Sequence, residues 1–142
     1  MTTTKFAVSL FALLILATGN LCAEQTNSAP ANSVPATKVK RLTVEEYDKL
    51  RAATNTVILD VRSAAEFEKG HIPGATNIDI SSAKFAERIG ALDTNKTYLV
   101  NCAVGMRSAR ACKKMEGMGF ANLYDLGGGF DGWKQAHKPI EK

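Results

Sequence analysis

The residues in this chain whose types and spacing could do chemistry are a cysteine and an arginine, Cys102 and Arg107. They bracket a short loop of small and apolar residues that includes Gly105 and has no acidic side chain. A thiol is nucleophilic only as its thiolate. Loop amides, the N-terminus of a following helix and a guanidinium all stabilise that anion. The pattern therefore favours Cys102 as a nucleophile and Arg107 as an anion-binding residue.

The other anion-binding donors of this loop are backbone N–H groups. They belong to Ala103, Val104, Gly105, Met106 and Ser108. Because the side chains at positions 103, 104 and 106 offer no donors, specificity would depend on Arg107 and the backbone. The competing interpretation is a buried structural cysteine beside a surface cation, which is the common case for a lone cysteine. The order of strand, cysteine, glycine loop, arginine and helix favours the nucleophile.

Two elements must position this loop. The β-rich residues 97–100 predict a strand that ends at the loop, and residues 108–117 predict a helix that follows it. Four side chains of the helical segment are expected to face the core, namely Ala109, Cys112, Met115 and Met118. Since Cys112 lies more than one helical turn beyond the loop, we expect it to pack in the core without forming a disulfide to Cys102.

Strands and helices alternate through the rest of residues 41–142. Leu42 and residues 57–59, 77–80 and 122–125 predict strands, whereas residues 44–52, 64–68, 83–89 and 130–137 predict helices. Thr43 with Glu46 forms a capping-box pattern, and Ser63, Ser81 and Ser82 are further candidate caps. The alternation predicts an α/β domain of three layers, with about five mainly parallel strands and helices on both faces. Sites in such sheets form at the carboxyl ends of strands, where Cys102 lies.

Several ordered motifs accompany the cysteine loop. They are Asp60-Val61-Arg62, Glu66-Phe67, Gly70-His71-Ile72-Pro73-Gly74-Ala75 with Asn77-Ile78, and Gly128-Gly129-Phe130-Asp131-Gly132-Trp133. With the Cys-x4-Arg loop they make residues 42–136 resemble the single-domain rhodaneses, which are sulfurtransferases. Asp60, Arg62, Gly128, Gly129 and Trp133 are expected to be structural. Asp60 and Arg62 would brace a strand end, the glycines would let backbone pass close to the loop, and His71 is expected to be a turn residue.

The resemblance implies a rhodanese-like fold and transfer of a sulfane sulfur. The donor would be thiosulfate or a similar small anion, Cys102 would carry a persulfide, and a thiophilic acceptor such as cyanide, a thiol or a protein would take the sulfur. No metal or organic cofactor is implied. The alternative is a sulfur-carrier or partner-binding module with little turnover. A phosphatase or arsenate reductase is disfavoured because the phosphatase loop has one more residue between cysteine and arginine.

The N-terminal third has a different composition. Residues 1–23 resemble a secretory signal. Their apolar stretch is shorter than the roughly 20 residues that span a bilayer. Residues 24–40 resemble a flexible linker. We therefore expect export to the periplasm or medium, the alternatives being an uncleaved anchor or, less favoured, a lipid on Cys22. The net charge of +4, without basic runs, indicates no nucleic-acid binding.

Overall fold

A central sheet organises the domain. The computed structural model describes residues 39–142, so the predicted signal and almost all of the linker lie outside the described residues. The strands are β1 (Lys40–Leu42), β2 (Thr56–Asp60), β3 (Thr76–Asn77), β4 (Thr97–Asn101) and β5 (Asn122–Leu126). They lie in the order β1-β5-β4-β2-β3, and every pairing between these strands is parallel.

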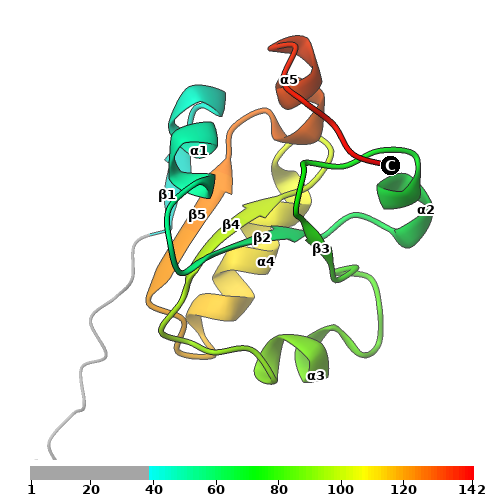
Figure 1. Ribbon diagram of the computed structural model, residues 1–142. Coiled ribbons are helices and arrows are strands. Elements are labelled where there is room, and N and C mark those ends of the chain that lie inside the picture. Colours follow the sequence, from blue (N-terminus) through cyan, green and yellow to red (C-terminus); the bar gives the residue numbers. More distant parts are fainter. Residues whose placement is uncertain (1–38) are drawn as a thin grey trace, which may run out of the picture. The chain divides into compact units, whose positions relative to one another are not determined.

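Helices cover both faces of the sheet (Figure 1). They are α1 (Val44–Arg51), α2 (Ala64–Glu68), α3 (Phe85–Gly90), α4 (Met106–Glu116) and α5 (Gly129–Gln135). Alternate residues of a strand point to opposite faces, so the sheet supplies two separate cores. Leu59 and Val100 pack with α3 and α4, whereas Ile58 and Leu99 pack with α1 and α5. The prediction of a three-layer α/β domain is confirmed.

Two capping boxes fix where α1 and α2 begin. The Thr43 hydroxyl accepts a hydrogen bond from the Glu46 amide at 3.3 Å, and the Glu46 carboxylate accepts one from the Thr43 amide at 2.9 Å. Ser63 and Glu66 make the same pair of bonds, at 3.3 and 3.1 Å. Each box satisfies amides that the first helical turn leaves without partners, which is why both starts agree with the sequence prediction.

Several predicted boundaries were wrong. The helix after the cysteine loop begins at Met106, two residues early, and ends at Glu116, so Met118 lies beyond it and is 38% exposed instead of buried. α5 ends at Gln135, short of residue 137. The third strand stops at Asn77, and the chain then enters a turn in which the Asp79 carboxylate accepts from the Ser81 amide.

The start predicted for α3 was also wrong. α3 begins at Phe85 after Lys84, which makes no side-chain cap hydrogen bond. Neither Ser81 nor Ser82 is its N-cap, although the Ser82 hydroxyl accepts from the Lys84 amide at 3.2 Å in the turn before it.

Within residues 39–142, no helix combines the length and apolar character needed to cross a bilayer.

Candidate active site

The candidate site lies at the carboxyl edge of the sheet. β2 and β4 are parallel neighbours whose last residues, Asp60 and Asn101, are paired in register. Cys102 follows β4 directly, so the loop that it opens lies beside the residues that follow β2. This is the edge at which an open parallel sheet forms its binding sites.

The sulfur of Cys102 is surrounded by donors. Sγ accepts a hydrogen bond from the Gly105 amide at 3.1 Å and one from the Ser108 hydroxyl at 3.5 Å, and Cys102 is 1% exposed. Burial raises the pKa of the Cys102 thiol, but hydrogen bonds from the Ser108 hydroxyl and from the amides of Ser108, Gly105 and Val104 outweigh it. The pKa of the thiol is therefore below its ordinary value, so at a given pH more of it is thiolate than in a free cysteine.

The curl of the loop depends on glycine and on contacts with α5. Gly105 has φ of 99°, a left-handed conformation that glycine adopts without a steric penalty. The Cys102 and Ala103 carbonyls accept hydrogen bonds from the Phe130 and Asp131 amides at 2.7 and 3.0 Å. A Cβ on Gly129 would lie 2.5 Å from both carbonyl oxygens, so only glycine lets the two backbones come this close. The start of α5 thus holds the loop carbonyls.

The guanidinium of Arg107 is paired with a carboxylate. Its Nη1 and Nη2 donate to Glu66 Oε2 and Oε1 at 2.8 and 2.7 Å, and the two side chains are 31% and 37% exposed. The hydrogen bonds from Arg107, helped by those from Ser63, lower the pKa of Glu66 to about 2. None of the hydrogen bonds found within residues 39–142 joins Arg107 to the Cys102 sulfur. The positive charge beside the loop is therefore largely compensated by Glu66.

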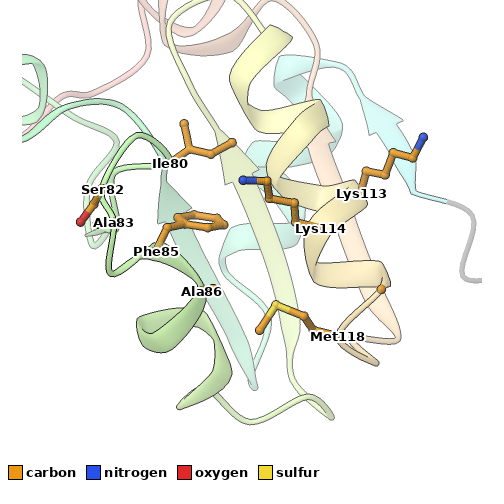
Figure 2. A pocket seen from close by; sticks show the side chains of 9 residues that line it. Ile80, Ser82, Ala83, Phe85, Ala86, Lys113, Lys114 and Met118 are labelled. Atoms are coloured by element: carbon orange, nitrogen blue, oxygen red, sulfur yellow. The ribbon is translucent and has the colours of Figure 1, made fainter.

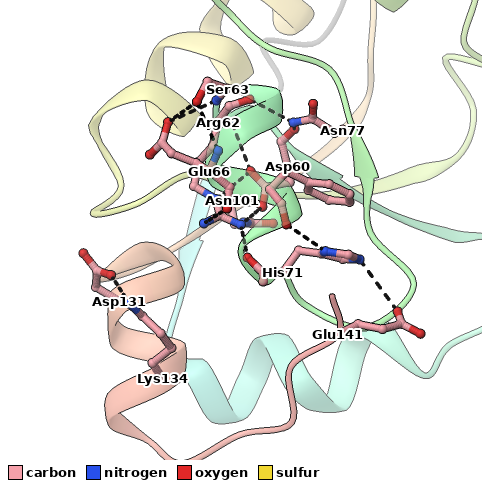
Figure 3. A network of polar contacts seen from close by, with 12 residues as sticks. Asp60, Arg62, Ser63, Glu66, His71, Asn77, Asn101, Asp131, Lys134 and Glu141 are labelled. Carbon is pink, nitrogen blue, oxygen red and sulfur yellow. Dashed lines mark hydrogen bonds and ion pairs between the residues drawn. The ribbon is translucent and has the colours of Figure 1, made fainter.

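A buried ion pair braces the end of β2 (Figure 3). Arg62 donates to the Asp60 carboxylate through Nε at 2.9 and 3.0 Å and through Nη2 at 2.7 Å. The same Nη2 donates to the Gly70 carbonyl at 2.8 Å, and the guanidinium lies 4.1 Å from the ring centroid of Phe130. The Asn77 side chain donates to the Asp60 and Arg62 carbonyls. These contacts tie β2, the turn after α2 and α5 together beside the loop.

The remaining motif residues hold segments of main chain around the site. His71 stacks on Phe67, with 3.7 Å between ring centroids, and its main chain pairs with that of Glu141. Gly128 is the N-cap of α5 with φ of 75°. Trp133 is fully buried, and its Nε1 donates to the Pro139 carbonyl at 2.7 Å. Their contacts are with the scaffold that holds the loop.

A pocket of about 320 Å³ opens next to the loop. Its wall mixes apolar side chains with charges of both signs; the contributing residues include Ala103, Glu66, Lys69, Phe130, Lys134 and Ile140. Figure 3 shows Lys134 paired with Asp131, and Nζ of the lysine lies 2.9 Å from Oδ1 of the aspartate. The pocket gives a small ligand a place beside Ala103, the residue after Cys102.

The sequence interpretation missed three contributors to this site. It counted the Ser108 amide but not its hydroxyl, it did not identify Glu66 as the partner of Arg107, and it did not foresee that α5 amides hold the loop. The hydroxyl could have been found, since Ser108 lies within one helical turn of the loop. The other two contacts join residues 28 or more positions apart and become visible only in the fold.

Comparisons with known proteins identify the family of this chain. A family model described as "Rhodanese-like domain" matches residues 43–136. Thiosulfate sulfurtransferase GlpE of Shewanella oneidensis is 33% identical over 98 residues, which cover 69% of this chain and 95% of that protein.

Two solved structures are similar as well. A rhodanese-related protein from Thermoplasma volcanium gives a TM-score of 0.64 at 27% identity, covering 72% of this chain and 97% of that one. A Rhodopseudomonas palustris protein of unknown function, described as a possible tyrosine phosphatase, gives 0.60 at 33% identity, covering 72% and 85%. The resemblance drawn from the motifs is confirmed: this chain belongs to the rhodanese-like family.

Proposed function

We propose that this protein is a sulfurtransferase that carries sulfur on Cys102. The observation that carries the proposal is the set of donors around Sγ, which lowers the pKa of the thiol although the residue is buried. A loop that stabilises an anionic sulfur stabilises a persulfide in the same way, since both place negative charge on sulfur. The GlpE relative is named as a thiosulfate sulfurtransferase, which supports thiosulfate or a similar small anion as the donor.

The proposed reaction has two steps. The Cys102 thiolate attacks the outer sulfur of thiosulfate, the sulfur–sulfur bond of thiosulfate breaks, and sulfite leaves with the electron pair of that bond. Cyanide, or a thiolate acceptor, then attacks the outer sulfur of the persulfide, and the Cys102 thiolate is released. With cyanide the product is thiocyanate. This is covalent nucleophilic catalysis with ping-pong kinetics.

The contacts of the loop support roles for the other residues in this reaction. Backbone amides of the loop, which runs from Ala103 to Ser108, would hold the charge on the persulfide. Arg107 would attract the anionic donor, at the cost of competing with Glu66 for its guanidinium. The pocket beside Ala103 would admit the donor and then the acceptor.

Mass spectrometry and a rate assay test the proposal. Wild-type protein treated with thiosulfate should gain one sulfur atom and lose it when cyanide is added, with formation of thiocyanate. Cys102→Ala should do neither. Cys112→Ala is the matched control, because burial raises the pKa of that thiol to about 12 and keeps it protonated. Equal thiocyanate rates for wild type and Cys102→Ala would refute the proposal.

A sulfur carrier with little turnover is a second candidate, and the ion pair between Arg107 and Glu66 favours it. A guanidinium already held by two hydrogen bonds attracts a dianion less strongly than a free one. A carrier would show the mass of a persulfide on Cys102 with very slow thiocyanate formation. At the same protein concentration, a sulfurtransferase would show the persulfide mass together with rapid thiocyanate formation.

We also propose that the protein is exported. The support is the apolar, signal-like composition of residues 1–23. Cell fractionation with intact-mass measurement tests this: export with cleavage predicts a shortened chain outside the cytoplasm. Retention of full-length protein in the membrane fraction would support the uncleaved anchor.

A further inference from the structure

A groove lies between α3 and α4, on the sheet face opposite α1 and α5. Its volume is about 490 Å³, and Ile80, Phe85, Ala86 and Met118 supply its apolar surface. Ile80 and Phe85 are buried in the floor, whereas Met118 is 38% exposed at the rim. Figure 2 shows the Lys114 side chain extending from α4 toward Phe85, with its ammonium 5.4 Å from the centre of the ring.

The exposed face of α4 joins this groove to the catalytic loop. At 3.6 residues per turn, Met106, Arg110, Lys113, Lys114 and Gly117 fall within one face about 100° wide. All five residues are exposed and none is acidic. Within residues 39–142, no ion pair is found to the three cations among them, Arg110, Lys113 and Lys114. Because α4 has 11 residues, this face runs for about 16 Å from the loop toward the groove. We call the face and the groove together the α4 surface.

We propose that the α4 surface docks an acidic segment of a partner protein, which inserts an apolar side chain into the groove. The charges on the surface are of one sign and none of them is held in an ion pair within residues 39–142, so carboxylates along the segment would pair with Arg110, Lys113 and Lys114. The groove floor is apolar, so burying a leucine- or phenylalanine-sized side chain there supplies hydrophobic free energy. A segment seated this way extends along α4 toward Met106, one end of the catalytic loop.

The alternative ligand for a basic, partly apolar surface is an anionic membrane. Membrane-binding faces present apolar side chains that protrude into the lipid. Here Phe85 and Ile80 are recessed and buried, so they can receive an inserted side chain but cannot insert into a bilayer. The shape of the groove therefore favours the peptide.

Fluorescence anisotropy tests the proposal without any sulfur transfer. The probe is a fluorescein-labelled peptide of alternating glutamate and leucine, and its counterpart has glutamine at each glutamate. Wild-type protein should bind the acidic peptide, more weakly as salt rises, and should bind the glutamine peptide much less. Lys114→Glu should weaken binding of the acidic peptide about fivefold or more, since an attraction becomes a repulsion.

Matched controls separate the surface from overall charge and apolarity. Lys49→Glu makes the same charge change on α1, across the sheet, and Leu50→Gln, also on α1, places the same polar side chain as Met118→Gln away from the groove. Only Lys114→Glu and Met118→Gln should reduce binding. Equal losses in the controls would overturn the proposal. So would binding to phosphatidylglycerol vesicles, sensitive to Lys114→Glu, without peptide binding.

The two proposals can fail separately. Peptide binding with no persulfide on Cys102 would leave the docking surface standing and refute the sulfurtransferase. Persulfide formation without peptide binding would refute the docking surface and leave the sulfurtransferase standing.

Discussion

At the scale of single residues, the two described cysteines show what shifts the pKa of a thiol in this protein. Both are buried, yet the pKa of Cys112 is raised to about 12 and that of Cys102 is lowered. Burial raises both values, and Asp125 raises that of Cys112 further. The difference lies in the donors aimed at Cys102, which the sequence predicted for the backbone of the loop.

Replacing the hydroxyl that reaches the sulfur should shift the ionisation of Cys102. In Ser108→Ala the thiolate loses one donor, so its pKa should rise by about one unit, since a hydrogen bond to a charged group contributes about 1.5 kcal/mol. Because thiolate is the reactive form, the pH midpoint of iodoacetamide alkylation should move upward. Ser81→Ala, on an exposed turn, should leave the midpoint unchanged. An unshifted midpoint in Ser108→Ala would mean that the backbone amides alone lower the pKa of the Cys102 thiol.

Removing the carboxylate that holds Arg107 should strengthen donor binding. Glu66→Gln keeps the shape of the side chain but leaves the guanidinium charge uncompensated, so KM for thiosulfate should fall several-fold. Thr43→Ala is the control, because it breaks the equivalent cap of α1 and touches neither Glu66 nor Arg107. A higher KM in Glu66→Gln would mean that Glu66 orients Arg107 for the donor.

At the scale of elements, local chemistry explains which boundaries the sequence predicted correctly. The starts of α1 and α2 are encoded by four consecutive residues each, Thr43–Glu46 and Ser63–Glu66, and both were predicted. The third strand was predicted too long because residues 77–80 alternate as a strand does, whereas only Thr76 and Asn77 pair with β2. Strand pairing depends on a partner strand, and the alternation of apolar and polar residues within one segment does not reveal where that pairing stops.

The contact between α5 and the loop can be tested at Gly129. Gly129→Ala places a Cβ within 2.5 Å of the Cys102 and Ala103 carbonyls, at a φ of 60°. We expect a loss of about 3 kcal/mol or more in unfolding free energy, or displacement of the loop. Gly119→Ala has a comparable φ of 89° and open space, so it should cost about 1 kcal/mol. Urea unfolding measures both, and equal losses would mean that the close approach contributes nothing.

At the scale of the whole molecule, the parallel sheet brings distant segments to one edge. The sequence predicted the layers, the parallel strands and the position of Cys102, because each follows from hydrophobic runs and their order. It did not predict that Glu66 holds Arg107, 41 positions away. That contact depends on the in-register pairing of β2 with β4, which no local pattern specifies.

The carboxylates in ion pairs should make the fold sensitive to acid. The pKa of Glu66 is lowered to about 2 by Arg107, and that of Asp48 is lowered by Lys138 and Arg51. A carboxyl whose folded pKa is depressed stabilises the fold above its unfolded pKa, near 4, and loses that effect as pH falls toward the folded value. We expect about 1 to 2 kcal/mol to be lost between pH 5 and pH 2, given their partial exposure to solvent.

Urea unfolding at a series of pH values checks this, with Glu66→Gln as the control. That variant lacks the Glu66 carboxyl and keeps that of Asp48, so acidification should destabilise it less than wild type. An identical decline in both proteins would exclude Glu66 from the effect.

The near-complete enclosure of Cys102 sets which reagents can reach it. With 1% of the residue accessible, a molecule must present its reactive atom at the tip of a narrow group. Terminal sulfur atoms, cyanide and the end of a cysteine side chain have that shape, whereas a disulfide flanked by aromatic rings does not. The burial that removes water from the Cys102 thiol should therefore also exclude bulky oxidants from it.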